Sequence, residues 1–177
     1  MKEILAKALE YEITYRVIGR AHYISADRYT HLNRVFGIPV IIITATVGTT
    51  IFGTLNQNPD PTWKIAAGLF SLAGTVLASL QTSLGFAQTA EKHKAAGEAY
   101  RALRRRFEML RLRYSEARPE QREVAITDLE AIVADLAELP KEFPTIPDRC
   151  YNQALEEQKK TIMPNHTMQR TAPRSDA

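Results

Sequence analysis

The sequence has no charged residue in two long stretches, Val35–Pro59 and Ile65–Ala90, although 24% of the chain is charged. A transmembrane helix needs about 20 mainly apolar residues to cross a hydrocarbon core about 30 Å thick. Each stretch is long enough, and the gap Asp60–Lys64 suits a tight connection. These stretches predict a two-pass membrane hairpin. The alternative is a soluble pair of buried helices, but such helices normally keep a polar face.

Cysteine is nearly absent, since Cys150 is the single one and cannot form an internal disulfide. This favours the reducing side of a membrane. The first 34 residues contain no apolar run of the kind that secretory signals use, so no signal peptide is expected. The net charge of +3 comes from residues beside the apolar stretches, and no nucleic-acid partner is expected.

Motifs that carry chemistry are also missing. The sequence has no Gly-rich phosphate loop, HExxH, CxxC or GxSxG motif. Asp27 and His31 have a spacing that two metal ligands could use, but a surface pair is far commoner. His93 follows the second stretch and could titrate near neutral pH or serve only in packing. We therefore predict no catalytic, cofactor-binding or metal-binding residue, and a membrane enzyme is the least favoured alternative.

The first span is expected over Ile38–Leu55, with Gly37 and Pro39 at its entrance. Proline fits the first turn of a helix, where its missing N–H would have no partner anyway. At about 1.5 Å per residue this span covers about 27 Å, which is barely enough to cross the hydrocarbon core of a bilayer. The second span is expected over Ile65–Ala87 and is less apolar than the first.

The second span carries a stripe of small and hydroxyl residues with a spacing of about four. Such a stripe can let helix backbones approach closely, or it can face water in a pore built from several copies. Helix packing is the more conservative interpretation, and the two are compatible. The candidate pore or helix-interface residues are Ser71, Thr75, Ser79, Gln81 and Ser83.

Basic residues flank the hairpin on the side of both termini, whereas the connection offers only Lys64, offset by Asp60. The positive-inside rule therefore predicts cytoplasmic termini and an external loop, with Trp63 at the membrane interface. Arg104, Arg105 and Arg106 follow the second span. They form either a solvated positive flank or a contact for anionic lipid or a phosphate ligand.

Heptad spacing predicts helices on both sides of the hairpin, which makes the fold class all-α: a two-pass hairpin with a cytoplasmic helical bundle. The expected domains are an amphipathic helix over residues 1–36, the hairpin over 37–90, cytoplasmic helices over 91–161 and a disordered tail over 162–177. The heptad positions include Ile4, Ala8, Tyr15, His22, Ser25, Ala96, Tyr100, Leu103, Phe107, Leu110, Tyr114, Leu129, Ile132 and Leu136.

The order of these segments resembles the SLATT family of two-transmembrane effectors, which occur with bacterial nucleotide-signalling and sensor modules. The most family-like pieces are the Gly-Ile-Pro entrance at Gly37–Pro39 and the segment with His93 and Tyr100–Leu103. The resemblance covers about Ala6 to Leu139 and is weakest after Pro119.

The resemblance implies an oligomeric effector of a bacterial defence or conflict system. Such an effector would form a pore, or otherwise disrupt the inner membrane, when a partner or nucleotide signal triggers it. The resemblance gives no residue-level site, and no fused ligand-binding domain is expected. The alternative is a membrane-anchored scaffold that does not conduct and recruits a cytoplasmic partner.

Overall fold

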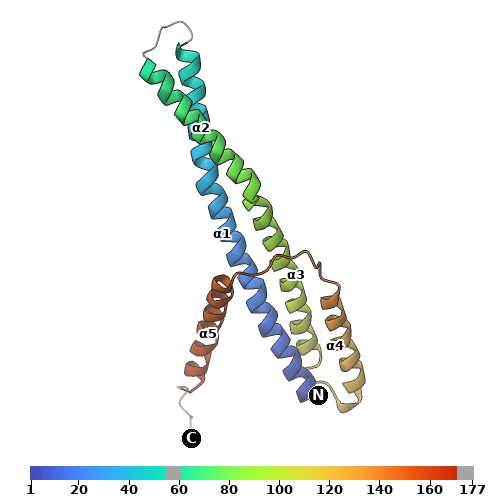
Figure 1. The fold of residues 1–177 in the computed structure, drawn as a ribbon. Coiled ribbons are helices and arrows are strands. Elements are labelled where there is room, and N and C mark those ends of the chain that lie inside the picture. The colour runs from blue at the N-terminus through green and yellow to red at the C-terminus, as the bar shows by residue number, and fades with distance from the viewer. Residues whose placement is uncertain (55–60, 171–177) are drawn as a thin grey trace. The chain divides into compact units, whose positions relative to one another are not determined.

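The computed structural model describes residues 1–54 and 61–170, and those residues form helices without any strand, which confirms the all-α prediction (Figure 1). Residues 55–60 and 171–177 lie outside the described residues. The elements are α1 (Lys2–Thr54), α2 (Pro61–Leu84), α3 (Phe86–Arg113), the short 3-10 helix η1 (Pro119–Gln121), α4 (Arg122–Ala137) and α5 (Asp148–Arg170).

The chain divides into two compact units. Residues 27–91 form the hairpin unit, and residues 1–26 together with 92–177 form the core unit. The expected domain boundaries at residues 36 and 90 stay predictions. Helix α1 supplies residues to both units, as does α3.

Helix α1 differs from the expected arrangement at Pro39. We expected a separate span to start near Gly37, but α1 is one helix of 53 residues with Pro39 in its interior. Proline removes one hydrogen bond to the carbonyl four residues earlier and favours a kink. The residues on both sides of Pro39 are compatible with a helix. The helix therefore loses one hydrogen bond at Pro39 but continues past it.

Gly85 separates α2 from α3, which we expected to form one continuous helix. Its φ of +55° lies in the left-handed region, where glycine carries no Cβ penalty. The Gly85 amide still donates to the Gln81 carbonyl at 3.3 Å, and the Thr89 amide donates to the Gly85 carbonyl at 3.0 Å. The break is therefore one residue long.

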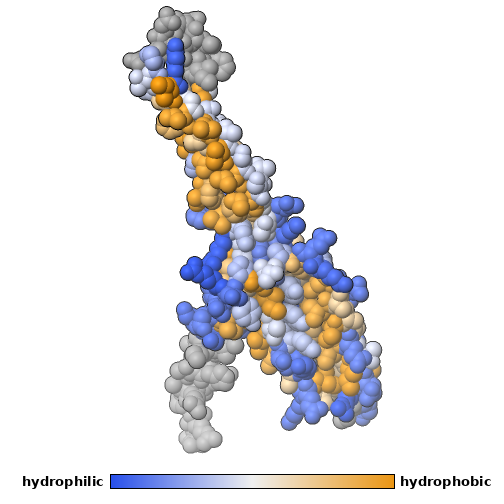
Figure 2. Space-filling view, viewed as in Figure 1, coloured by the Kyte–Doolittle hydropathy of each residue, from blue (hydrophilic) through white to orange (hydrophobic). Residues whose placement is uncertain are grey.

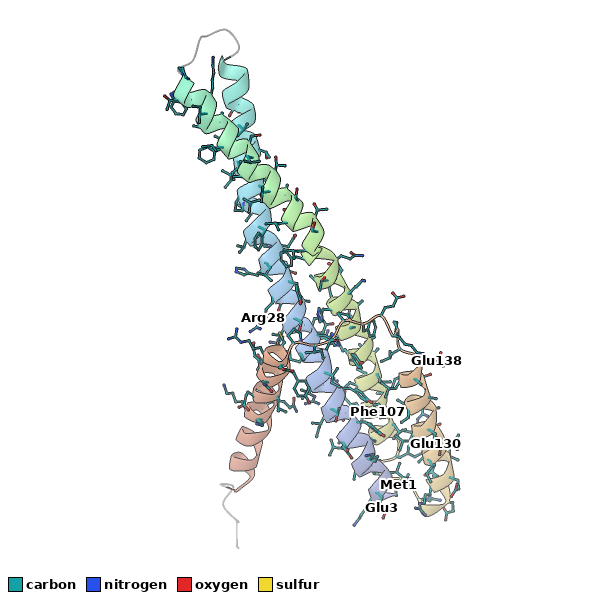
Figure 3. All side chains as sticks on the ribbon, viewed as in Figure 1. Met1, Glu3, Arg28, Phe107, Glu130 and Glu138 are labelled. Carbon is teal, nitrogen blue, oxygen red and sulfur yellow. The ribbon has the colours of Figure 1, made fainter. Side chains whose placement is uncertain are left out.

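The core unit is built around aromatic side chains of α1 and α3. Phe107 of α3, labelled in Figure 3, is fully buried. Its ring stacks on Tyr11 and Tyr15, with ring centroids 5.1 and 5.7 Å away. Helix α4 adds Ala125 and Ile132 to the same cluster. The heptad positions of the sequence therefore form this core, because residues three and four apart share one face of a helix.

Helix α5 packs on another part of α1 within the core unit. Cys150 and Ala154 of α5 are buried in a cluster with Val17, Ala21 and Ile24 of α1. A helix was expected from Asp148 to about Thr161. Helix α5 begins there and its bounds extend to Arg170. The expected disordered tail over residues 162–177 stays a prediction.

Two segments are long and apolar enough to cross a membrane, one within Lys2–Thr49 and one within Pro61–Arg113. Only 6% of the most apolar window of each is buried, whereas the core helix of a soluble protein is mostly buried. Figure 2 shows the apolar residues gathered along α2 and the part of α1 beside it in the hairpin unit. Their exposure fits a hairpin that lipid surrounds, which favours the membrane prediction over the soluble alternative.

Candidate functional site

The small residues of α2 contact α1 within the hairpin unit. Gly74 is buried, and a Cβ atom placed on it would lie 3.0 Å from the Ile43 Cγ2 atom. A larger residue at position 74 would push the two helices apart. Part of the predicted stripe therefore serves close helix packing, as small residues do in membranes.

Gln81, the most polar candidate on α2, is directed toward α1. Its Nε2 atom donates to the Asn33 Oδ1 atom at 3.3 Å and lies beside Gly37, where an added Cβ would be 2.9 Å away. Gly37 therefore provides space for the Gln81 amide. Gln81 therefore makes a polar contact between the two helices of one hairpin.

The four hydroxyl candidates Ser71, Thr75, Ser79 and Ser83 are exposed. The Thr75 hydroxyl donates to the Ser71 carbonyl at 2.9 Å, a common way for a membrane helix to satisfy a hydroxyl. Within the part of the chain that the structure describes, the hydroxyls of Ser79 and Ser83 have no hydrogen-bond partner.

An open groove of about 450 Å³ runs between α1 and α2 of the hairpin unit. Ser71, Thr75 and Ser79 line its α2 side, and Thr44 and Gly48 lie on its α1 side. The structure thus brings three of the five candidates to one surface, and it places Gln81 against α1 and Ser83 outside the groove lining.

The side chains of Arg104, Arg105 and Arg106 do not all share one surface. Arg104 is half-buried and its Nη2 atom donates to Glu108 at 3.2 Å, while its Nε atom is buried without a partner among the described residues. Arg106 donates to Asp135 of α4. Arg105 is exposed on α3. Adjacent residues of a helix point in different directions, so the triplet divides between surfaces.

Arg105 and Arg106 line an open groove of about 460 Å³ between α3 and α4 in the core unit. Arg113 completes its basic rim and is paired with Asp128 at 3.0 Å. The floor is apolar and consists of Ala102, Met109, Leu110, Ala131 and Ile132.

The core unit also contains a buried histidine pair that the sequence did not suggest. The Nδ1 atoms of His22 on α1 and His93 on α3 are 2.9 Å apart, and the two residues are 3% and 1% exposed. The Tyr100 ring stacks on His22 with ring centroids 5.5 Å apart. The Phe143 ring lies edge to face with His22, with ring centroids 6.5 Å apart.

Two glycines bring α1 and α3 close enough for this pair to form. A Cβ placed on Gly97 would lie 3.1 Å from the Tyr23 ring and 3.3 Å from the Gly19 carbonyl oxygen, and both glycines are buried. The imidazoles therefore meet beside a tight helix crossing.

Burial and the neighbouring His93 lower the pKa of His22 from 6.5 to about 4, and burial lowers the pKa of His93 as well. Both changes follow from the cost of placing a charged imidazole away from water. Of the two roles considered for His93, titration near neutral pH and packing, its burial and lowered pKa favour packing. His93 lies three residues before Ala96 and so continues the heptad stripe of α3. This spacing was the one sequence signal that could have predicted the burial of His93.

Among the described residues, no cluster of three or more histidine, cysteine or acidic side chains could hold a metal ion. Asp27 and His31 are both exposed. The hairpin unit therefore offers close helix packing and exposed hydroxyls, and the core unit, taken by itself, holds a buried histidine pair.

These features describe a two-helix membrane domain whose chain also forms a helical core. The profile of the SMODS and SLOG-associating 2TM effector domain family 4 matches residues 13–165, and the chain belongs to this SLATT family. The family description links the domain to SMODS and SLOG modules. No curated protein and no solved structure has significant similarity to the chain.

Proposed function

We propose that the protein is an oligomeric effector that perforates the bacterial inner membrane as part of a defence or conflict system. In this proposal the core unit lies in the cytoplasm with both termini and keeps the assembly closed until a partner or a nucleotide signal acts. The match to an effector domain associated with SMODS and SLOG modules supports a sensor partner of this kind. A ligand or partner shifts such an equilibrium only if it binds one state better.

The observation that carries the proposal is the exposed, unpartnered hydroxyl of Ser79. It lies in the charge-free part of α2, lines the groove beside Thr75, and has no hydrogen-bond partner among the described residues. A polar group in hydrocarbon without a partner is unfavourable, so this face favours a neighbouring copy or water over lipid. One hairpin cannot enclose a channel, and a pore therefore needs several copies.

The test is induced expression in bacteria that carry a potential-sensitive dye. Wild-type protein is expected to depolarise the membrane, and Ser79→Leu is expected to reduce depolarisation at equal protein level because leucine blocks the polar face. The matched control is Leu80→Phe, which adds similar bulk at an exposed apolar position of the same helix and should leave depolarisation unchanged. A membrane potential that stays intact with wild-type protein under every trigger tried would refute the pore.

The second candidate is a scaffold that does not conduct and recruits a partner to the membrane. The groove between α3 and α4 favours it, because its floor is apolar and its rim holds Arg105 beside the pairs Arg106–Asp135 and Arg113–Asp128, a combination that suits a partner segment with apolar and charged residues. Replacing both spans with an unrelated membrane anchor separates the candidates. A scaffold would keep its activity, and a pore would lose it.

A further inference from the structure

We infer that His22 and His93 form a proton-sensitive clasp that holds α1 against α3 while both imidazoles are neutral and releases them when the pair takes up protons. The Nδ1–Nδ1 distance of 2.9 Å and the nearly complete burial of both rings define the clasp. The clasp concerns the core unit alone, so its test does not depend on whether the proposed pore exists.

The chemistry of imidazole limits how many protons the clasp can hold. A hydrogen bond between two Nδ1 atoms needs one N–H donor and one bare acceptor nitrogen. If both rings are charged, each Nδ1 carries a proton, and two donors and two positive charges face each other. The doubly protonated pair therefore cannot keep this contact, and its buried charges favour an opened arrangement in which water reaches the rings.

The aromatic rings that contact the clasp are neutral, and the neighbouring turn of α1 adds a hydroxyl group. Helix α1 contributes Ser25, whose hydroxyl donates to the Ala21 carbonyl at 2.9 Å, and α3 contributes the stacked Tyr100 ring. The segment before α5 contributes Phe143.

Charged and titratable groups lie at the edge of this environment. Arg20 of α1 is paired with Glu157 of α5 at 2.7 Å, and the buried Cys150 thiol packs on the α1 face that includes Ala21. On α3, Glu91, Lys92 and Lys94 flank His93 in sequence and are exposed. Burial is accordingly the main cause of the lowered pKa of both histidines.

The direction of the pH effect follows from linkage. The closed state holds His22 with a pKa near 4, whereas an opened state returns it toward the ordinary value of 6.5. The opened state then binds more protons below pH 6.5, so acid favours opening and the closed state is fully favoured above that pH. From His22 alone, the closed-to-open ratio should fall about tenfold between pH 7.5 and pH 5.5.

The experiment measures hydrogen exchange of peptides from α3 in the full-length protein in detergent micelles at pH 7.5, 6.5 and 5.5. Rates are corrected for the intrinsic pH dependence of exchange. Protection over residues 93–107 should fall about tenfold in wild type and in the control His31→Asn, which changes an exposed histidine of the same helix as His22. The double variant His22→Asn, His93→Asn should lose this pH dependence, because an asparagine amide can hydrogen-bond near the Nδ1 position and does not titrate.

Protection that is independent of pH in wild type, or a double variant that keeps the tenfold change, would overturn the clasp. If the double variant does not fold, the wild-type imidazole nitrogens are titrated by NMR. Two rings that remain neutral at pH 6, one of them protonated at Nδ1, support the clasp. Titration of both rings near pH 6.5 overturns it.

Discussion

The Gln81 side chain donates a hydrogen bond to Asn33 at 3.3 Å and occupies the space that Gly37 leaves open. Both helices of the hairpin unit thus share a polar contact beside an otherwise apolar surface. Hydrogen bonds of this kind stabilise helix pairs in membranes by about 1 kcal/mol. The contact gives Gln81 a role within one chain, independent of how many copies assemble.

We expect Gln81→Leu to destabilise the hairpin by about 1 kcal/mol, because it removes this hydrogen bond and leaves the Asn33 side-chain oxygen without its donor. Thermal unfolding of the purified protein in detergent measures the change. Gln88→Leu, which alters an exposed glutamine of α3, is the control and should unfold at nearly the wild-type temperature. Equal unfolding temperatures for both variants would refute the assignment.

A disulfide should form between cysteines placed at Ile43 and Gly74. A Cβ on Gly74 would lie 3.8 Å from the Ile43 Cβ, which is close to the ordinary separation in a disulfide of about 3.8 Å. In a Cys150→Ser background the pair Ile43→Cys, Gly74→Cys is therefore expected to oxidise within one chain, as judged by mass spectrometry. The pair Ile43→Cys, Gly68→Cys is the control, since nothing lies within 4 Å of a Cβ on Gly68. Oxidation of the control alone would show that the helix register is wrong.

Glu12 should be important for stability although it is charged. Its side chain is 4% exposed and accepts hydrogen bonds from Arg16 at 2.7 Å and from Arg111 of α3. Glu12→Ala leaves two arginines without their partner and is expected to cost about 2 kcal/mol in the free energy of unfolding. Glu10→Ala removes only an exposed pair with Lys7 and should have little effect. Chemical denaturation of both variants provides the comparison.

Gly85→Ala should destabilise the junction between α2 and α3. A Cβ at a φ of +55° costs about 1 kcal/mol, because the left-handed conformation crowds it against the following carbonyl. Gly68→Ala, in the interior of α2, should be neutral or stabilising, since alanine is the better helix former. Thermal unfolding measures the change in stability of both variants. A loss of stability in Gly68→Ala as large as that in Gly85→Ala would contradict the prediction.

Much of the fold follows from the sequence because charge and heptad spacing report burial directly. The charge-free stretches located the hairpin, and positions such as Ala96, Leu103 and Phe107 located the core of α3. The continuity of α1 through Pro39 did not follow, because a proline is compatible both with a helix start and with a kinked interior. The break at Gly85 was also missed, since glycine within an apolar helix can serve packing as well as a turn.

The candidate site was predictable only in part. The sequence predicted the stripe of α2. The direction of the Gln81 side chain, however, depends on the space that Gly37 leaves on α1. The pairing of His22 with His93 depends on the close crossing of Gly19 and Gly97, which are far apart in the chain. Contacts of this kind come from tertiary geometry, which periodicity along one helix does not specify.

The most direct test of the proposed pore uses purified protein inserted into lipid vesicles that hold a potassium diffusion potential. The account predicts that wild-type protein dissipates the potential, that Ser79→Leu slows dissipation, and that Leu80→Phe behaves as wild type. Vesicles that contain inserted wild-type protein and still hold the potential at every protein-to-lipid ratio, at pH 7.5 and at pH 5.5, would contradict it.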